Sequence, residues 1–392
     1  MKYKYQLITL GSDTPFIENI LSLFNSRVSE LNISLDSFKI INRDNFEREY
    51  LGNQPAFTFY FGDKNGNFKD VEIAKKLLED GSMILPIFFT EDAFSDEIPK
   101  VLENQNGIQY KQIENDRIVN IALESFELLR NTRKIFISYR RDESSSVAIQ
   151  LFEALESHNF DVFLDTHSVG KGEPFQEELW HRMADSDVIV LLSTPEFLSS
   201  KWCEEEFAEA GAKQIGIIQL VWPNHNIEKD DTSHISYPTK LKKENFVNDL
   251  FDDKDASKLK SDFLENIIKD VESIRARNLA ARQDSLITNF RSIASKLGKN
   301  IVVQPERFLT EDLPGDLRRI FIPTIGVPQS NSCQTAEIRN EMRSGKVSIR
   351  LIYDDLRIRK KWIDHLDWLN TNLNIDIKTL KKQEFESWLR NN

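Results

Sequence analysis

The feature that most constrains this chain is a repeated alternation of short apolar runs with longer segments of helical periodicity. Val188–Ser193 is the clearest of the apolar runs, because it carries no charged residue. A strand of this kind is buried on both faces, which is typical of a central position in a parallel sheet. Apolar strands that alternate with helices predict α/β domains. The 392 residues are enough for two or three of them.

We expect three α/β domains with boundaries at 1–131, 132–245 and 246–392. The first has the pattern of a small doubly wound domain, with helices between its strands. Its expected strands are Tyr5–Leu10, Phe38–Asn42, Phe57–Phe61 and Met83–Phe89, and its expected helices are Pro15–Leu31, Val71–Glu79 and Arg117–Arg130.

The second domain repeats the same alternation. Its expected strands are Ile135–Tyr139, Asp161–Leu164, Val188–Ser193 and Ile215–Val221, and its expected helices are Ser144–Ser157 and Gln176–Met183. Polar breaks follow Tyr139, Asp165 and Ser193, at the carboxyl ends of three strands. Because ligands of open α/β sheets bind at that edge, these breaks are the first place to look for a site.

The remainder of the chain begins with a polar segment, 225–243, that is typical of a loop. Lys258–Arg291 has an apolar residue at nearly every fourth position, which predicts one or two helices. The basic run Arg275–Arg282 within it fits a connector, an assembly surface or a nucleic-acid contact.

The last hundred residues predict a third α/β segment. Two features lie at its expected strand ends: the constrained turn Pro323–Ser330, and Asp354 with Asp355. Each is either a ligand or partner site or a rigid turn beside solvated carboxylates. Its expected strands are Ile301–Gln304, Arg319–Pro323, Ser348–Tyr353 and Ile375–Leu380, and its expected helices are Ala336–Arg343, Arg359–Leu369 and Gln383–Leu389.

Composition excludes several classes of function. The net charge of −12 argues against nucleic acid as the main partner, which would need a concentrated basic surface. No apolar run reaches the ~20 residues of a membrane span, and no secretory leader begins the sequence. Cys203 and Cys333 are the two cysteines, so we expect a cytoplasmic protein without disulfides. The sequence has no glycine-rich phosphate loop and no cluster of metal ligands, so we expect neither a cofactor nor a metal.

The stretch Leu198–Phe207 carries an unusual amount of chemistry. Ser199 or Ser200 can cap a helix, and three glutamates then fall in its first turns, where the helix dipole favours negative charge. Trp202 and Glu206 are four residues apart and therefore share one helical face. One carboxylate thus lies beside a flat aromatic surface. Taken alone, the stretch also fits an ordinary capped surface helix.

With its neighbours, this stretch resembles part of a Toll/interleukin-1 receptor (TIR) domain. The resemblance runs from Lys134 to about Pro223, under a quarter of the chain, and rests on three boxes in the family's order and spacing. The boxes are Ile135-Phe136-Ile137-Ser138-Tyr139-Arg140-Arg141; Phe163-Leu164-Asp165 with Gly170-Lys171-Gly172 and Phe175; and Leu192-Ser193, Phe197-Leu198, Ser200-Lys201-Trp202-Cys203 and Glu206.

The resemblance implies a flavodoxin-like, doubly wound parallel sheet and one of two activities. TIR domains act as adaptors that assemble receptors or as enzymes that cleave NAD⁺ at the nicotinamide–ribose bond. In the enzymes a glutamate of the third box is essential, and the Trp-x-x-x-Glu spacing assigns that role to Glu206 rather than Glu204 or Glu205. A carboxylate suits this reaction, because the ribose passes through an oxocarbenium-like state as in glycoside cleavage.

Other site residues follow from the same matching. Tyr139 borders the nucleotide, while Arg140 or Arg141 pairs with the pyrophosphate, for which a guanidinium fork is suited. Asp165 and Phe175 lie at the two ends of the loop that, in an assembled active site, reaches the base of the substrate. Trp202 offers a stacking face. Each also has a structural alternative: Tyr139 and Trp202 as packing residues, and Arg141 as a solvated surface charge.

We therefore expect an NAD⁺ hydrolase of a bacterial defence system that is activated by self-association. NAD⁺ is its substrate, and ADP-ribose or a cyclic variant its product. The flanking domains would sense a trigger or drive assembly, and the first resembles a degenerate TIR-like unit without an equivalent of Glu206. The alternative is a non-enzymatic TIR scaffold, in which Glu206 is an ordinary surface residue.

Overall fold

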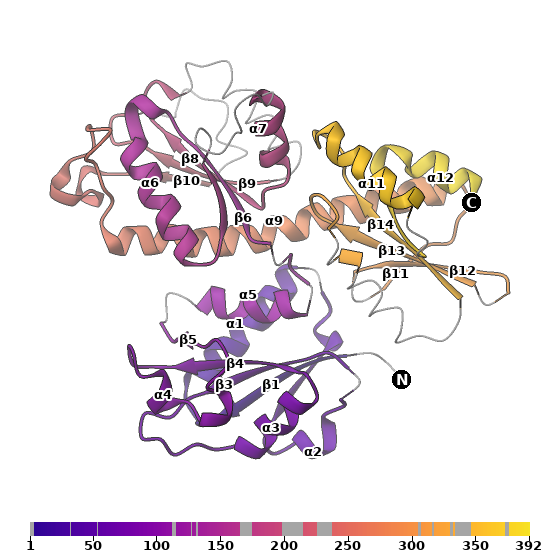
Figure 1. Ribbon diagram of the computed structural model, residues 1–392, viewed down its shortest axis with the longest axis horizontal. Helices are drawn as coiled ribbons and strands as arrows, with labels where there is room; N and C mark the ends of the chain where they lie inside the picture. The colour runs from indigo at the N-terminus through magenta and orange to yellow at the C-terminus, as the bar shows by residue number, and fades with distance from the viewer. Residues whose placement is uncertain are drawn as a thin grey trace. The chain divides into compact units, whose positions relative to one another are not determined.

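A computed structural model gives the fold, and the chain forms two units, Met1–Asn131 and Thr132–Asn392 (Figure 1). The structure describes residues 4–31, 33–52, 54–111, 115–126, 128–130, 132–164, 175–197, 215–225, 237–304, 307–315, 317–329, 332–333, 346–372 and 376–392. It describes the side chains of these residues except at 175–178 and 346.

The first unit is a parallel five-stranded sheet of order β2-β1-β3-β4-β5. This is the flavodoxin-like order, and helices cover both faces. Phe46 and Leu77 from the helices on one face pack against Ile8 and Tyr60 of the sheet. The strands are β1 Tyr5–Gly11, β2 Phe38–Asn42, β3 Ala56–Phe61, β4 Met83–Phe88 and β5 Ile108–Gln109. The helices are α1 Phe16–Glu30, α2 Phe46–Glu49, α3 Val71–Glu79, α4 Phe94–Glu97 and α5 Asn115–Ser125.

The second unit begins with another parallel sheet, of order β10-β9-β8-β6-β7. Counted along the chain, this is the same 2-1-3-4-5 order, so the prediction of doubly wound parallel α/β domains is confirmed. The central strand β8 is buried throughout. The strands are β6 Lys134–Ser138, β7 Asp161–Leu164, β8 Val188–Ser193, β9 Gly216–Val221 and β10 Tyr237–Lys240, and the helices are α6 Arg141–Ser157 and α7 Phe175–Ala184.

Strand β10 lies within the segment that was expected to be a loop, and that expectation is wrong for its last residues. The strand is a short edge strand whose side chains are mostly exposed. It therefore lacks the apolar pattern on which a strand prediction depends. Pro238 is tolerated there because an edge strand has only one neighbour to bond.

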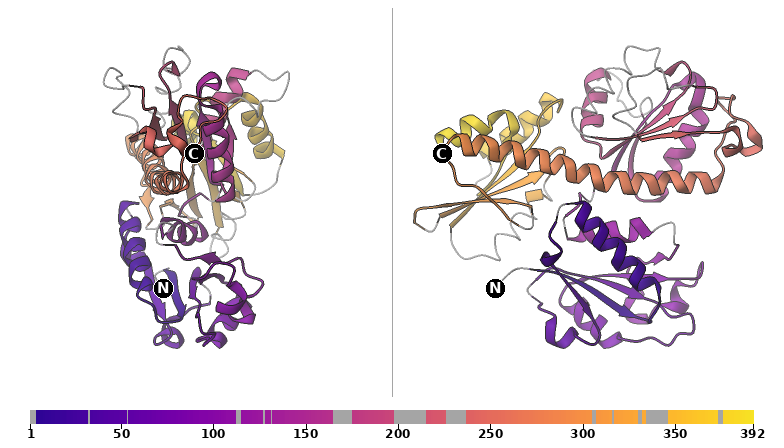
Figure 2. Two further views of the ribbon diagram at one scale, coloured as in Figure 1. Left: turned by 90° about the vertical axis from the view of Figure 1, so that its left-hand side faces the viewer. Right: turned by 180° about the vertical axis from the view of Figure 1, so that it is seen from behind.

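Helix α9, Ser261–Lys296, is one continuous helix of 36 residues. Its first half packs Val271 and Ile274 against the β6–β10 sheet, and its second half packs Leu286 and Phe290 against the next sheet. Seen from behind, it runs unbroken from one sheet to the other (Figure 2). Apolar residues on different sides of the helix thus serve two cores in succession.

The basic run on α9 is not the free surface that a nucleic-acid contact would need. Arg275 is fully buried and paired with Asp187. Arg282 donates to the backbone carbonyls of Ala184 and Ser186. A buried guanidinium must be paired, so these arginines hold the helix to its sheet rather than face solvent. The connector interpretation of this helix is the one the structure supports.

The last sheet has the sequential order β11-β12-β13-β14-β15. Its first pairs are antiparallel, and β13, β14 and β15 run parallel. The sequence did not predict β12, because its acidic residues hide the strand pattern; the expected helix Ala336–Arg343 lies outside the described residues. The elements are β11 Val302–Val303, β12 Leu309–Leu313, β13 Leu317–Thr324, β14 Lys346–Tyr353, β15 Ile377–Lys381, α11 Lys360–Asn372 and α12 Phe385–Asn391.

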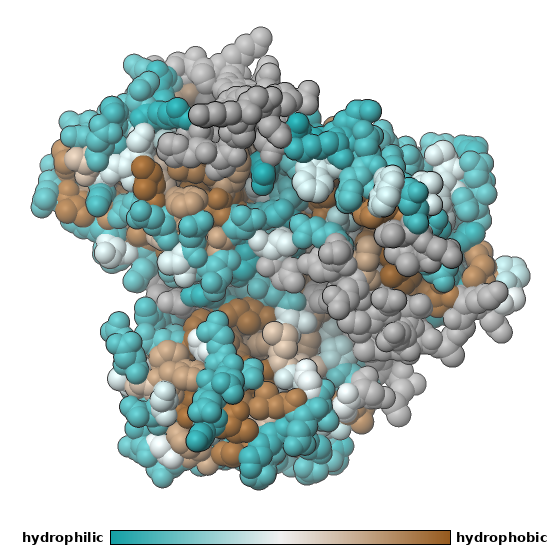
Figure 3. Space-filling model, viewed as in Figure 1, coloured by the Kyte–Doolittle hydropathy of each residue, from teal (hydrophilic) through white to brown (hydrophobic). Residues whose placement is uncertain are grey.

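The chain also contains short segments of 3₁₀ helix. They are η1 Leu35–Ser37, η2 Lys100–Leu102, η7 Lys243–Asn245, η8 Val247–Asp249 and η9 Lys382–Glu384. Within the described part of the chain, no helix combines the length and apolar character that crossing a bilayer requires. Hydrophilic residues spread over the visible face, interrupted by smaller apolar areas (Figure 3).

Candidate functional site

The candidate site lies at the carboxyl edge of the β6–β10 sheet, where β6 and β8 are neighbours. The chain leaves β6 toward β7 on one side and returns to β8 on the other, so strand order reverses between them. In open α/β sheets, this switch point is where a crevice opens to receive a ligand. Tyr139 and Arg140 follow β6, and Thr194 to Phe197 follow β8.

Arg140 is fixed by the turn after β8. Its Nη1 donates to the backbone carbonyl of Glu196 at 2.7 Å, and its Nη2 lies 2.8 Å from Oε2 of the same residue. Both side chains are partly exposed, so this pair adds little to stability. The pair instead holds a guanidinium at the switch point, with one nitrogen on a backbone carbonyl and the other on a carboxylate.

A second contact joins the start of α6 to the same turn. The hydroxyl of buried Thr194 donates to the carboxylate of Glu143. The helix is irregular here, because Ser144 has non-helical dihedral angles of −144° and 24°. Arg140 and Glu143 therefore both hold the segment after β8, one through a carboxylate and the other through a hydroxyl.

The polar groups beneath this edge are also paired. The Nε2 atom of fully buried Gln219 donates to the hydroxyl of Ser193 at 3.2 Å, between β9 and β8. The amide of Trp222 donates to the carbonyl of Ser193 at 2.9 Å. An unpaired buried polar group lowers the stability of the fold, so these hydrogen bonds stabilise the strand ends beneath the switch point.

The structure places some of the predicted site residues and leaves others outside its description. Arg140 lies at the edge, and Arg141 is the exposed first residue of α6. Tyr139 is 5% exposed and packs in the core between the sheet, α6 and α9. Phe175 begins α7, but its side chain is not described. Asp165, Trp202 and Glu206 lie outside the described residues.

Sequence reasoning missed Glu143, Thr194 and Glu196. The turn carrying Thr194 and Glu196 directly follows an expected strand end, so the rule for ligand edges could have drawn attention to it. No local pattern could have paired Arg140 with Glu196, because the two are 56 residues apart in sequence.

The turn Pro323–Ser330 and the Asp354–Asp355 pair make contacts within the second unit. The amide of Val327 donates to Oδ1 of Asp185, just after α7, at 3.0 Å. Asp354 pairs with Lys382 at 2.8 Å, and Asp355 accepts from the amide of Gln383 at 3.3 Å. These interactions fit structural roles for both features.

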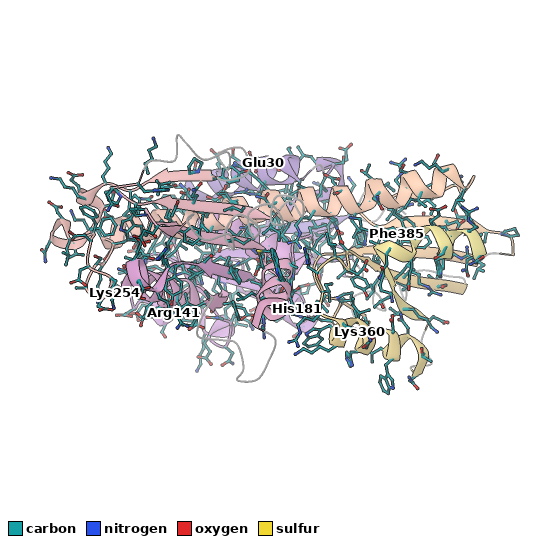
Figure 4. All side chains as sticks on the ribbon, turned by 90° about the horizontal axis from the view of Figure 1, so that it is seen from above. Glu30, Arg141, His181, Lys254, Lys360 and Phe385 are labelled. Atoms are coloured by element: carbon teal, nitrogen blue, oxygen red, sulfur yellow. The ribbon has the colours of Figure 1, made fainter. Side chains whose placement is uncertain are left out.

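Aromatic rings make a further contact between α7 of the β6–β10 domain and the domain of the last sheet. The ring of His181 on α7 is nearly parallel to that of Trp362 on α11, with centroids 6.0 Å apart. The guanidinium of Arg357 lies over the Trp180 ring at 4.9 Å. Figure 4 shows His181 close to the start of α11, marked by Lys360. Helix α7 is therefore held on its C-terminal half by the last domain.

Among the described residues, no group of three or more histidine, cysteine, aspartate or glutamate side chains is arranged to hold a metal ion.

Three comparisons with known proteins give matches, and the match to a family model lies in the middle of the chain. Residues 135–259 match the family model described as "TIR domain". The chain is 24% identical over 148 residues to "2' cyclic ADP-D-ribose synthase BtTIR" of Bacteroides thetaiotaomicron. That alignment covers 35% of this chain and 51% of the relative, so the chain spans about half of that relative's length.

Among solved structures, the chain is similar to a tagatose-6-phosphate ketose/aldose isomerase from Escherichia coli. The match has 11% identity and a TM-score of 0.20, and covers 73% of this chain and 82% of that one. A TM-score this low carries no argument about fold or function.

Proposed function

We propose that this chain, whose residues 135–259 match the TIR domain model, cleaves NAD⁺ between nicotinamide and ribose, with Glu206 as the essential carboxylate. The observation that carries the proposal is the match, at 24% identity over 148 residues, to a relative named as a cyclic ADP-ribose synthase. The Trp-x-x-x-Glu spacing of Trp202 and Glu206 supports the assignment of the carboxylate.

The chemistry needs little from the protein at the leaving group. When the ribose–nitrogen bond breaks, its electron pair goes to the positively charged pyridinium, and nicotinamide departs neutral. The ribose is left as an oxocarbenium-like cation, which the carboxylate of Glu206 stabilises. Water then attacks the anomeric carbon and loses a proton, giving ADP-ribose. If a hydroxyl of the same ADP-ribose attacks instead, the product is cyclic.

Substrate orientation falls to the cationic and aromatic side chains. Arg140 and Arg141 bind the pyrophosphate, Asp165 lies beside the nucleotide, and Phe175 and Trp202 are base-stacking faces. Tyr139, which is buried in the core, supports this edge from beneath. Because Arg140 is bound to Glu196, the substrate's pyrophosphate has to compete with that carboxylate or rely on Arg141. NAD⁺ is the substrate, and no further cofactor is needed.

Self-association completes the active site, and the two flanking domains receive the trigger. In this proposal the protein acts in defence against phage, where consuming NAD⁺ or releasing a cyclic signal stops the infected cell. The rival is a TIR scaffold that assembles partners without chemistry.

The experiment is an assay of nicotinamide release by concentrated protein incubated with NAD⁺. We expect wild type to consume NAD⁺ and Glu206→Gln to lose activity by about 10² or more, the size of losing one group that stabilises transition-state charge. Glu204→Gln is the matched control, since it removes a neighbouring carboxylate of the same stretch and should stay active.

Chromatography of the products separates linear from cyclic ADP-ribose. A wild type that stays inert at every concentration, or a Glu206→Gln variant with full activity, refutes the enzymatic proposal and leaves the scaffold. Circular dichroism of each variant shows whether the fold is retained.

A further inference from the structure

The last sheet carries a row of cations on the face that α9 and α12 cover. Arg350 of β14 lies directly opposite Lys378 of β15 and opposite Phe321 of β13. Arg319 is two residues from Phe321 and therefore lies on the same face, diagonal to Arg350. Like charges at directly opposed positions of neighbouring strands are destabilising. Three adjacent strands thus bring three positive side chains together.

The indole of Trp388 on α12 lies beside this row. The Cζ atom of Arg319 is 5.4 Å from the ring centroid, and that of Arg350 is 5.5 Å from it. Phe385 at the start of α12, labelled in Figure 4, packs in the core under the same helix. Trp388, Arg350 and Lys378 are all half-buried, so the cluster reaches solvent at the edge of α12.

The negative charge available to this cluster is too small. Glu311 lies 3.1 Å from Arg319 and 3.8 Å from Lys299, so one carboxylate serves two cations. Arg350 donates to neutral oxygens: the hydroxyl of Ser348 at 3.1 Å, the carbonyl of Ile349 at 2.8 Å and that of Asp376 at 3.4 Å. Within the part of the chain described, neither Arg350 nor Lys378 forms an ion pair.

This arrangement is electrostatically unfavourable for Arg350. Desolvation and then the charge of Arg319 lower the pKa of the Arg350 guanidinium, and Asp376 offsets only part of this. A charged group kept in such a place without a counter-ion costs stability in the free protein. Sites that violate a stability rule in this way are often functional.

We infer that this face, formed by Arg319, Arg350, Lys378 and Trp388, binds a phosphoryl group of a small ligand. Guanidinium groups match phosphate oxygens in geometry and charge, and they bind them more strongly than neutral donors do. If the ligand is a nucleotide, its base can stack on the indole by displacing a guanidinium group that lies over the ring. The site is separate from the proposed NAD⁺-cleaving site, because it lies on a different sheet.

The test is isothermal titration and thermal unfolding of the full chain with inorganic phosphate, pyrophosphate and AMP. Sodium chloride at equal ionic strength is the control for screening. We expect the phosphoryl compounds to raise the unfolding temperature above the chloride control. Tighter binding of AMP than of phosphate would identify a nucleotide as the source, and equal binding a phosphoryl group alone.

Arg350→Gln should weaken binding about tenfold or more, since a charged hydrogen-bonding pair is lost. The same substitution should raise the unfolding temperature of the ligand-free protein, because it removes the repulsion with Arg319 and Lys378. The matched control is Arg390→Gln, an exposed α12 arginine paired with Glu386, which should leave both quantities unchanged. If Arg350→Gln does not fold, Arg350→Lys keeps the charge without the fork and should bind at least several-fold more weakly.

The inference is overturned if none of the three compounds stabilises the protein beyond chloride. It is also overturned if the Arg350 variants bind as tightly as wild type, or if Arg390→Gln weakens binding as much as they do.

Discussion

The buried pair of Asp187 and Arg275 is the most informative place to perturb the second unit. Both side chains are 0% exposed, and Nε of Arg275 donates to Oδ2 of Asp187 at 2.8 Å. The backbone of Asp187 is tied as well, since its amide donates to the carbonyl of Lys134 at 2.7 Å. The pair fastens α9 to the start of β8.

Removing the carboxylate should be severe, because Asp187→Ala takes away a carboxylate that pairs with the fully buried Arg275 guanidinium. Breaking a buried pair in this way costs about 3–5 kcal/mol, which is roughly two to four powers of ten in the folding equilibrium. Replacing both partners with apolar residues of similar size is typically neutral or stabilising by about 1–4 kcal/mol. Asp187→Leu combined with Arg275→Met should therefore recover what Asp187→Ala loses.

Tryptophan fluorescence during urea unfolding is a selective assay. All six tryptophans, at 180, 202, 222, 362, 368 and 388, lie in the second unit, so the signal reports on that unit alone. The reasoning is refuted if Asp187→Ala costs less than about 1 kcal/mol, or if the double variant is as unstable as the single one. Either result would mean that water or relaxation compensates the charge of Arg275.

Two further predictions concern close packing and a buried hydroxyl. Gly216→Ala should destabilise the second unit by about 1–3 kcal/mol in the same urea assay. The reason is that the added Cβ would lie 2.6 Å from Ile274 Cγ2 and 2.7 Å from Asn278 Nδ2 on α9. A variant as stable as wild type would contradict this prediction. Tyr353→Phe should be neutral or slightly stabilising, because the buried Tyr353 hydroxyl has no hydrogen-bond partner among the described residues. Burial raises the pKa of Tyr353, so the unfolded chain ionises first. Stability should therefore fall as pH rises above about 10 in wild type and less so in the variant, as unfolding scans between pH 8 and 11 would measure.

The fold was predictable wherever a local pattern decided the outcome. Val71–Glu79, Asp161–Leu164 and Val188–Ser193 have the predicted limits, because apolar periodicity and turn residues define them locally. Strands β10 and β12 escaped prediction because their existence depends on a neighbouring strand rather than on their own composition.

The candidate site was predictable only in part. The place of Arg140 at a strand end follows from the alternation of strands and helices, whereas its pairing with Glu196 depends on tertiary structure. The buried role of Arg275 was hidden for the same reason: its partner, Asp187, is 88 residues earlier in the chain. The assignment of Glu206 still rests on resemblance and stays a prediction.

Helix α9 leaves no hinge between the β6–β10 sheet and the last sheet. A chain that crosses between domains through a loop lets each turn freely, but here one rigid rod is embedded in both cores. The contacts of Val327 with Asp185 and of Trp362 with His181 act as a brace at a second point. Helix α9 and these contacts together fix the orientation of the last sheet relative to the β6–β10 sheet, which a single attachment would not do. A ligand that shifts the last sheet must therefore either break these contacts or move α7 together with the sheet. Ligand binding at the last sheet can in this way change the position of α7 in the β6–β10 domain.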